Sequence, residues 1–269
     1  MSEPLSLNYQ YFGGEGNPPL VILHGLLGSS RNWTSVGREL AKEFEVFALD
    51  LRNHGQSPHS DEMDYALMAG DVKHFLDNNQ LESVTLVGHS MGGKTAMRLA
   101  VDSPKHIKSL VVVDISPKPY PSHNLSELGT MQALPLDTIK SRKEAEAHFE
   151  DFGITDWAHR QFLLTNLVRD AEKGGFKWQV NVAGIDRNMA LVANTPLAAD
   201  ERFEGPTLFI RGEQSDFMQD DDVSKIQEHF PYSRIDLIPN AGHNVHVENK
   251  VGFLEALATL KNTDWGCEV

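Results

Sequence analysis

A serine flanked by glycines two residues away on either side is the strongest chemical signal in this chain. Ser90 lies in Gly88-His-Ser-Met-Gly92, directly after the apolar run 84–87 and before the helical pattern 91–101. Glycines at this spacing relieve crowding where a buried strand turns sharply into a helix. The turn exposes the serine hydroxyl near a helix N-terminus, where developing negative charge is favoured. The segment therefore predicts that Ser90 is a nucleophile.

A second glycine-containing loop is a candidate for holding a negatively charged oxygen. The segment Leu23-His-Gly-Leu-Leu-Gly28 directly follows the apolar run 20–23. A loop at the end of a buried strand can aim the Leu26 N–H at the same point as the Met91 N–H. Acyl transfer needs two such donors for the oxygen of its tetrahedral intermediate. Leu26 and Met91 are therefore the predicted oxyanion hole.

One of the twelve histidines stands where a general base would be needed. His243 follows the strand pattern 234–238 and the turn 239–242, and it precedes the last helical pattern, 247–260. A loop in this place lies at the edge of the sheet where Ser90 is expected, so His243 is the predicted general base. His246 could form a metal pair with His243, but no third ligand has suitable spacing. The sequence therefore predicts neither a metal nor a cofactor.

The carboxylate that would orient this imidazole has two candidates, both at the ends of predicted strands. Asp114 ends the run Val111-Val-Val-Asp, and Asp216 lies in Arg211-Gly-Glu-Gln-Ser-Asp after the following core strand. Either could reach His243. A third polar segment, Asp50-Leu-Arg-Asn-His-Gly-Gln-Ser57, also follows a strand, and we expect Asp50 and Arg52 to brace a turn near the site rather than to act in catalysis.

The elements that must position these residues alternate along the chain. Short apolar runs typical of strands buried on both faces are separated by amphipathic helical patterns, and the alternating segment 5–11 predicts an edge strand. The apolar runs are 20–23, 46–49, 84–87, 110–113, 208–210 and 235–238. This order predicts an α/β fold with a mostly parallel, doubly wound sheet.

One long interruption breaks this alternation. Between about residues 117 and 204, helical patterns such as 158–168 occur without buried strands between them. We therefore expect a core domain of residues 1–116 and 205–269 and an inserted, mostly helical cap of residues 117–204. Several large apolar side chains of the cap could line a pocket, but more of them are expected to form its own core: Phe149, Phe152, Trp157, Phe162, Leu163, Phe176 and Trp178.

Composition narrows the possible partners. Lys and Arg number 24 against 38 Asp and Glu, and the resulting net charge of −14 disfavours binding to nucleic acid or to an anionic membrane surface. The single cysteine, Cys267, excludes an internal disulfide, and the segment 1–6 lacks the basic and apolar regions of a signal peptide. The sequence thus predicts a cytoplasmic monomer or homodimer whose partner is a small-molecule substrate.

With these residues in place, the chain resembles the α/β-hydrolase superfamily over its whole length. Within it, four segments resemble the YbfF-like esterases and their ABHD-type relatives: His24-Gly-Leu-Leu-Gly-Ser, Asp50-Leu-Arg-Asn-His-Gly-Gln-Ser, Gly88-His-Ser-Met-Gly-Gly-Lys and Val112-Val-Asp-Ile-Ser-Pro. The resemblance implies a cofactor-free esterase that acts on short acyl chains and uses Asp114 as its acid. The chain departs from the pattern by retaining Asp216 and by having Asn244 after the base, so Asp216 stays an alternative.

Together these features predict a carboxylesterase-type serine hydrolase that forms an acyl-enzyme with esters of short to medium acyl chains. Thioesters, lactones and carbon–carbon bonds remain alternatives because the same three residues can serve them. A binding or receptor protein, or a lyase, is the alternative from another class, since the fold alone does not decide function.

Overall fold

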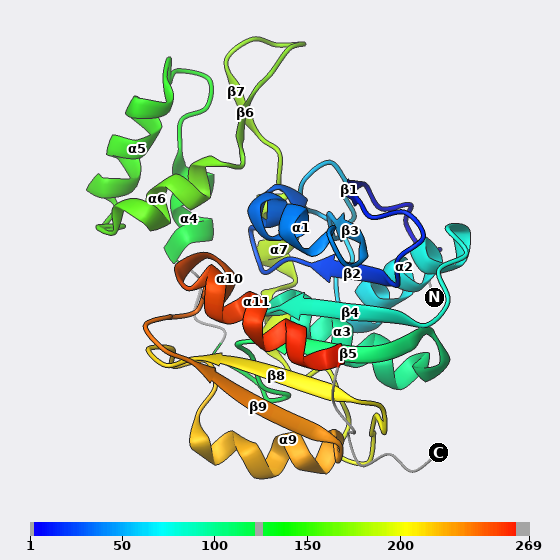
Figure 1. Cartoon of the computed structure of the whole chain (residues 1–269). Helices are drawn as coiled ribbons and strands as arrows, with labels where there is room; N and C mark the ends of the chain where they lie inside the picture. The colour runs from blue at the N-terminus through cyan, green and yellow to red at the C-terminus, as the bar shows by residue number, and fades with distance from the viewer. Residues whose placement is uncertain (1–2, 122–125, 262–269) are drawn as a thin grey trace.

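A seven-stranded mixed sheet organises the chain, whose computed structural model describes residues 3–121 and 126–261 (Figure 1). Its strand order is β1-β3-β2-β4-β5-β8-β9. The edge strand β1 is antiparallel to β3, and all the other neighbours are parallel. The strands are β1 (Tyr9–Gly13), β2 (Pro19–Leu23), β3 (Glu45–Leu49), β4 (Val84–His89), β5 (Ile107–Val113), β8 (Thr207–Gly212) and β9 (Ser233–Ile238). The predicted mostly parallel, doubly wound sheet is confirmed, and Cys267 lies outside the described residues.

Alternate side chains of the central strands enter two separate apolar clusters. On β2, Val21 and Leu23 belong to one cluster, while Leu20 and Ile22 belong to the other. Successive residues of a strand point to opposite faces, so both faces of the sheet need a cover of helices. This is why the strands read as continuous apolar runs in the sequence.

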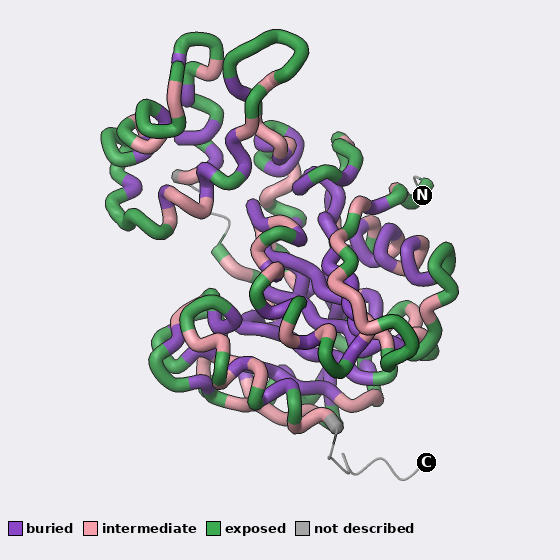
Figure 2. The backbone as a smooth tube through the Cα atoms, turned by 45° about the horizontal axis from the view of Figure 1, so that its top comes forward, coloured by how far each residue is buried: buried purple, intermediate pink, exposed green. Residues whose placement is uncertain are grey.

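Helices cover both faces of the sheet. The apolar side chains of α2, α3 and α9 belong to one cluster, and those of α1, α10 and α11 belong to the other (Figure 1). Figure 2 shows the buried chain concentrated along the sheet between these two layers. The helices are α1 (Thr34–Leu40), α2 (Tyr65–Asn78), α3 (Met91–Asp102), α9 (Val223–His229), α10 (Val245–Glu248) and α11 (Lys250–Ala258), with 3-10 turns η1 (Ser30–Trp33), η2 (Pro104–His106), η3 (Asp220–Asp222) and η4 (Thr259–Lys261).

The segment between β5 and β8 contains helices and one short hairpin. Figure 1 shows α4, α5, α6 and the β6–β7 hairpin grouped apart from the sheet, at the top left. The elements are α4 (Ser126–Ala133), α5 (Arg142–Asp151), α6 (Trp157–Leu164), β6 (Leu167–Arg169), β7 (Phe176–Trp178), α7 (Val182–Arg187) and α8 (Met189–Ala193). The helical pattern at 158–168 therefore ends earlier than predicted, because β6 begins at Leu167. The division into a core and a cap with the predicted boundaries stays a prediction.

Most of the aromatic and leucine side chains predicted for the cap core pack inside this segment. Phe149, Leu163 and Phe176 are buried, whereas Phe152 and Trp157 are 54% and 63% exposed. The first three side chains hold α5, α6 and the hairpin together by burying apolar surface. The side chains of Phe152 and Trp157 do not contribute to this packing and lie at the surface.

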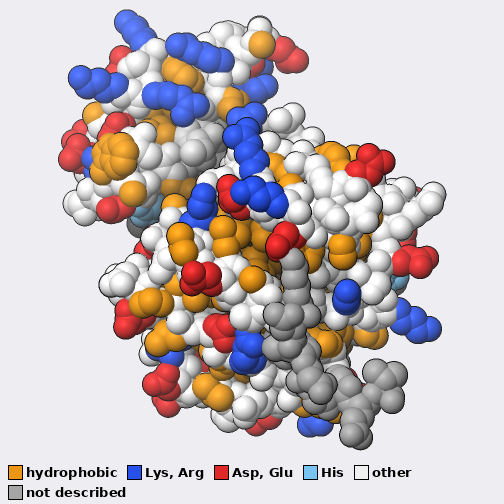
Figure 3. Space-filling model, in the orientation of Figure 1, with side chains coloured by type: hydrophobic (Ala, Val, Ile, Leu, Met, Phe, Trp, Pro, Cys, Tyr) orange, Lys and Arg blue, Asp and Glu red, His pale blue; other side chains and the backbone are white. Residues whose placement is uncertain are grey.

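The surface carries both signs of charge. Figure 3 shows Lys and Arg side chains gathered over the part of the molecule that holds α5 and the β6–β7 hairpin, with acidic side chains spread more widely. Within residues 3–121 and 126–261, no helix is long and apolar enough to cross a membrane.

Candidate active site

Ser90 occupies a strained turn between β4 and α3. Its φ of 51° and ψ of −117° lie outside the common regions for a residue with a side chain. The turn is possible because glycines flank it. A Cβ on Gly88 would lie 2.3 Å from the Gly92 carbonyl oxygen, and a Cβ on Gly92 would lie 2.5 Å from the carbonyl oxygens of Leu23 and His24. Strand, turn and helix therefore pack too closely for any other residue at these two positions.

His243 and Asp114 meet at the same edge of the sheet. The Nδ1 atom of His243 lies 2.8 Å from Oδ2 of Asp114. Asp114 directly follows β5 and is fully buried, and its other oxygen, Oδ1, accepts a hydrogen bond of 3.0 Å from the Gly212 N–H. His243 lies on the loop after β9 and keeps a quarter of its side chain exposed. A buried carboxylate bonded to Nδ1 selects the tautomer of the imidazole in which Nε2 is free to accept a proton.

Backbone contacts bring Ser90 to this pair. The Ser90 N–H donates to the carbonyl oxygen of Val113, the residue before Asp114, at 3.0 Å. The neighbouring residue, His89, bonds through Nε2 to the His243 carbonyl oxygen at 2.9 Å, and the two imidazole rings lie 4.7 Å apart. All three predicted residues are thus brought together by the ends of β4 and β5 and by the loop after β9.

His89 is a residue whose contribution the sequence did not indicate. Burial, with the charges of His243 and His246 as further causes, lowers the pKa of His89 well below 6.5. A neutral His89 can donate its Nε2 proton to the His243 carbonyl oxygen and hold the loop that carries the base. The position between the first glycine and the serine of this motif varies in residue type, so the identity of His89 alone gave no signal.

The predicted oxyanion donors lie on the two chain segments beside Ser90. Met91 is the first residue of α3, and its N–H has no partner within the helix by geometry. On the other segment, a Cβ on Gly25 would lie 2.9 Å from the His89 ring and 3.3 Å from the Ser90 Cβ. The backbone that leads into Leu26 therefore passes directly against Ser90. An oxyanion hole requires two such donors beside the nucleophile, and this role of Leu26 and Met91 stays a prediction.

Contacts from two directions fix the loop that carries Leu26. The Leu27 N–H donates to Nε2 of His54 at 3.1 Å, and the Leu27 carbonyl oxygen accepts from Nδ2 of Asn166 at 2.8 Å. Burial, followed by the charge of His24, lowers the pKa of His54 to about 3, which keeps Nε2 free to accept. Because Asn166 lies between α6 and β6, the predicted cap contacts the predicted oxyanion loop directly.

The alternative acid, Asp216, lies at the surface of the loop that follows β8. Its side chain is exposed and accepts a hydrogen bond of 3.5 Å from Nε2 of Gln219. Its two neighbours make the contacts with the site: the Ser215 hydroxyl donates to Oδ2 of Asp114, and the Phe217 ring stacks on His243. The carboxylate bonded to His243 is that of Asp114. The sequence reasoning missed Ser215 and Phe217 because neither belongs to a recognisable spacing.

Asp50 braces a turn close to the site. Its Oδ1 accepts from the Ser30 N–H at 2.7 Å, and its Oδ2 accepts from the Gln56 N–H at 2.9 Å and from Asn8 Nδ2 at 2.8 Å. Burial raises the pKa of Asp50, but the Gln56 and Ser30 hydrogen bonds outweigh it, so the pKa is lowered overall. A Cβ on Gly55, whose φ is +54°, would lie 2.2 Å from the Asp50 carboxyl carbon. These contacts agree with the structural role expected for this segment.

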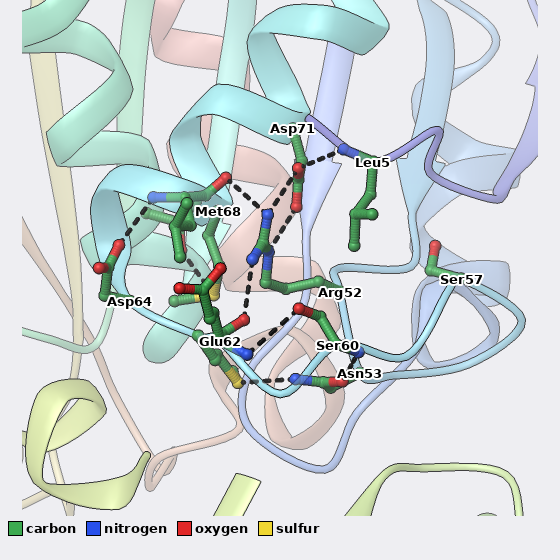
Figure 4. A network of polar contacts seen from close by, with 12 residues as sticks. Leu5, Arg52, Asn53, Ser57, Ser60, Glu62, Asp64, Met68 and Asp71 are labelled. Atoms are coloured by element: carbon green, nitrogen blue, oxygen red, sulfur yellow. Dashed lines mark hydrogen bonds and ion pairs between the residues drawn. The ribbon is translucent and has the colours of Figure 1, made fainter. Parts of the chain in front are cut away.

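Arg52 makes a buried ion pair with a helix. Its Nε and one of its terminal nitrogens donate to the two carboxylate oxygens of Asp71 at 2.6 and 2.8 Å, and both side chains are almost completely buried. Figure 4 shows the guanidinium between Asp71 and the Glu62 carbonyl oxygen, with the Leu5 N–H on the same carboxylate. Arg52 thus ties the turn after β3 to α2 and to the N-terminal segment.

His246 does not face an open site. Its ring is buried and stacks on Trp33, with centroids 4.0 Å apart and an interplanar angle of 8°. Among the residues described by the structure, no group of three or more His, Cys, Asp or Glu side chains is arranged to hold a metal ion.

The family model described as alpha/beta hydrolase fold matches residues 18–250. The chain belongs to this family. The sn-1-specific diacylglycerol lipase ABHD11 of Xenopus laevis is 38% identical over 268 residues, which cover 95% of this chain and 84% of that protein. Esterase YbfF of Escherichia coli (strain K12) is 32% identical over 252 residues, which cover 91% and 94%. A solved structure described as a marine microorganism esterase is 37% identical with a TM-score of 0.89, covering 96% of this chain and 99% of that one.

These likenesses extend over nearly the whole chain and agree in the kind of enzyme they name. The expected α/β-hydrolase fold, the resemblance to YbfF-like and ABHD-type proteins and the expected class, a carboxylesterase-type hydrolase, are confirmed. The roles of Ser90, His243, Asp114, Leu26 and Met91 stay predictions.

Proposed function

We propose that the chain hydrolyses carboxylic esters of short to medium acyl chains through an acyl-enzyme on Ser90. The observation that carries the proposal is the hydrogen bond from His243 Nδ1 to the buried Asp114, formed beside a serine in a strained turn. A base oriented by a carboxylate, beside a serine hydroxyl, is the arrangement that activates a serine nucleophile.

In the first half of the proposed reaction, Nε2 of His243 accepts the Ser90 hydroxyl proton as Oγ forms a bond with the ester carbonyl carbon. The carbonyl π electrons move to the oxygen, which the Leu26 and Met91 N–H groups stabilise. The oxyanion then collapses, the bond to the alcohol oxygen breaks, and the imidazolium gives its proton to the departing alcohol. Asp114 stabilises the imidazolium while it carries the charge.

In the second half, water repeats the same steps against the acyl-enzyme. His243 takes one proton from water as its oxygen adds to the acyl carbon, and it returns that proton to Ser90 Oγ as the carboxylic acid leaves. A serine at this turn argues against haloalkane dehalogenase or epoxide hydrolase chemistry, which needs a carboxylate there to form an alkyl ester.

A diacylglycerol is a second candidate substrate. Relatives 36–38% identical to the chain are named as sn-1-specific diacylglycerol lipases. Phe152, directly after α5, and Trp157, the first residue of α6, are large apolar side chains that stay exposed to solvent. Such side chains are suited to contact a substrate with long acyl chains.

A chain-length series of p-nitrophenyl esters, with a diacylglycerol assayed in parallel, tests the proposal and ranks its substrates. A fluorophosphonate probe should label the wild type and should fail to label Ser90→Ala, which keeps the fold but lacks the nucleophile. Labelling without turnover of any ester would favour a binding protein, and turnover without labelling would favour a lyase or another mechanism. Thioesters and lactones in the same series separate those alternatives from simple esters.

A cytoplasmic location and a monomeric or homodimeric state stay predictions. Size-exclusion chromatography with light scattering measures the second of these directly.

A further inference from the structure

An aromatic ring covers one side of the proposed general base. The centroids of the Phe217 and His243 rings are 3.8 Å apart, and the ring planes are inclined by only 19°. Phe217 is itself 38% exposed, so this large apolar side chain is not part of the protein core. An exposed phenylalanine in such close contact with an imidazole needs a reason other than core packing.

The backbone of Phe217 is held at both of its polar atoms. Its N–H donates to Ser215 Oγ at 3.2 Å, and the Ser215 hydroxyl in turn donates to the Asp114 carboxylate. The carbonyl oxygen of Phe217 accepts from the Tyr120 hydroxyl at 2.5 Å. The backbone from which the ring projects is therefore connected to the acid on one side and to Tyr120 on the other.

Tyr120 lies where the chain leaves the sheet for the predicted cap, and it also contacts the segment that returns. Its hydroxyl accepts from the Ser116 N–H at 2.9 Å, and its own N–H donates to the carbonyl oxygen of Ala193, the last residue of α8, at 2.8 Å. The Lys94 ammonium nitrogen, on the helix that begins after Ser90, lies 4.6 Å from the centre of the Tyr120 ring. Tyr120 thus touches both connections to the cap and the helix of the nucleophile.

We propose that Phe217 is a positioning residue for His243. Tyr120 links the position of the Phe217 ring to the position of the two chain segments that connect the sheet to the predicted cap. The inference rests on the proposed function. A single hydrogen bond at Nδ1 leaves the imidazole able to tilt and rotate about that bond. A flat ring stacked against it selects the orientation in which Nε2 faces Ser90.

The expected effect is a loss of turnover without a loss of substrate affinity. The stabilisation that an aromatic pair contributes corresponds to about a 2- to 13-fold change in rate when the contact is lost. Phe217→Leu, which keeps apolar volume but loses the flat ring, should lower kcat by that factor and leave KM nearly unchanged. Phe217→Tyr keeps the ring and should restore most of kcat.

Two further variants separate positioning from general stability. Tyr232→Leu removes an aromatic side chain of the same 38% exposure, on the turn before β9, and should leave kcat unchanged. Tyr120→Phe keeps the ring and removes the hydroxyl that holds Phe217. If Tyr120 acts through Phe217, the double variant with Phe217→Leu should lose little more activity than Phe217→Leu alone.

The deciding measurement is kcat and KM for these variants with one p-nitrophenyl ester, together with the proton NMR shifts of the His243 ring. Stacking moves those ring protons upfield in the wild type and in Phe217→Tyr, and the shift should disappear in Phe217→Leu. Equal kcat in the wild type and Phe217→Leu, with turnover intact, would overturn the positioning role alone. Failure of the wild type to cleave any ester would instead overturn the proposed function.

Discussion

Replacing His246 with phenylalanine should make the protein less sensitive to acid. The His246 ring is buried, stacks on Trp33 with centroids 4.0 Å apart, and lies 6.2 Å from the Phe253 ring centroid. Its Nδ1 has no hydrogen-bond partner among the described residues. Burial, and then the charge of His243, lowers the pKa of His246 from 6.5 to about 3. A phenyl ring fits the same aromatic stack without a group that must be kept neutral.

The direction of the pH effect on stability follows from the pKa of His246 in the unfolded and in the folded chain. Between pH 6.5 and about 3 the unfolded chain binds a proton at His246 that the folded chain does not, so acid favours unfolding in this window. At pH 5, one and a half units below the unfolded value, this residue alone lowers the free energy of unfolding by about 2 kcal/mol relative to pH 8. Phenylalanine cannot take up that proton, so His246→Phe should lose about 2 kcal/mol less than the wild type.

Urea unfolding at about pH 8 and about pH 5 measures this difference directly. Val247→Ala is a control on the same helix, α10, because the Val247 side chain is 64% exposed and its replacement keeps every titratable group of the protein. An equal loss of stability on acidification in the wild type and His246→Phe would refute the reasoning. A loss in Val247→Ala that is reduced as much as the loss in His246→Phe would refute it as well.

Three other changes test the structure at separate points. Arg52→Met leaves Asp71 buried without its ion-pair partner and should lower the free energy of unfolding in urea by about 3–5 kcal/mol. Burial lowers the pKa of Lys94 from 10.5 to about 7, so raising the pH from about 7 to about 9 should stabilise the wild type by about 2 kcal/mol relative to Lys94→Met in the same assay. Gly88→Ala places a carbon 2.3 Å from the Gly92 oxygen, and the resulting shift of Ser90 should lower kcat about a hundredfold.

The elements whose apolar residues follow one regular pattern were predictable from the sequence. The central strands read as uninterrupted apolar runs because both of their faces are covered, and the turn at Ser90 is marked by glycines that the close packing of β4 and α3 demands. The residues at which helices begin and end were harder to predict. The predicted helical pattern 247–260 is divided between α10 (Val245–Glu248) and α11 (Lys250–Ala258), because Asn249 caps the start of α11.

The parts that sequence reasoning left open depend on three-dimensional proximity. Asp114 and Asp216 both follow strands, and only the fold places one of them against His243 and leaves the other exposed. His89, Ser215 and Phe217 contact the pair across distant parts of the chain, and no periodicity or spacing marks such contacts. The β6–β7 hairpin was missed because strands of three residues are too short to establish an alternating pattern.

The most direct test of the account compares Asp114→Asn with Asp216→Asn in the hydrolysis of the preferred p-nitrophenyl ester. The two changes remove the same charge at positions that follow two neighbouring strands of the sheet, β5 and β8. The account predicts that Asp114→Asn loses about four orders of magnitude in kcat, as expected when the imidazole is held in the wrong tautomer, and that Asp216→Asn stays close to the wild type. A nearly normal Asp114→Asn beside an inactive Asp216→Asn would contradict the proposed site.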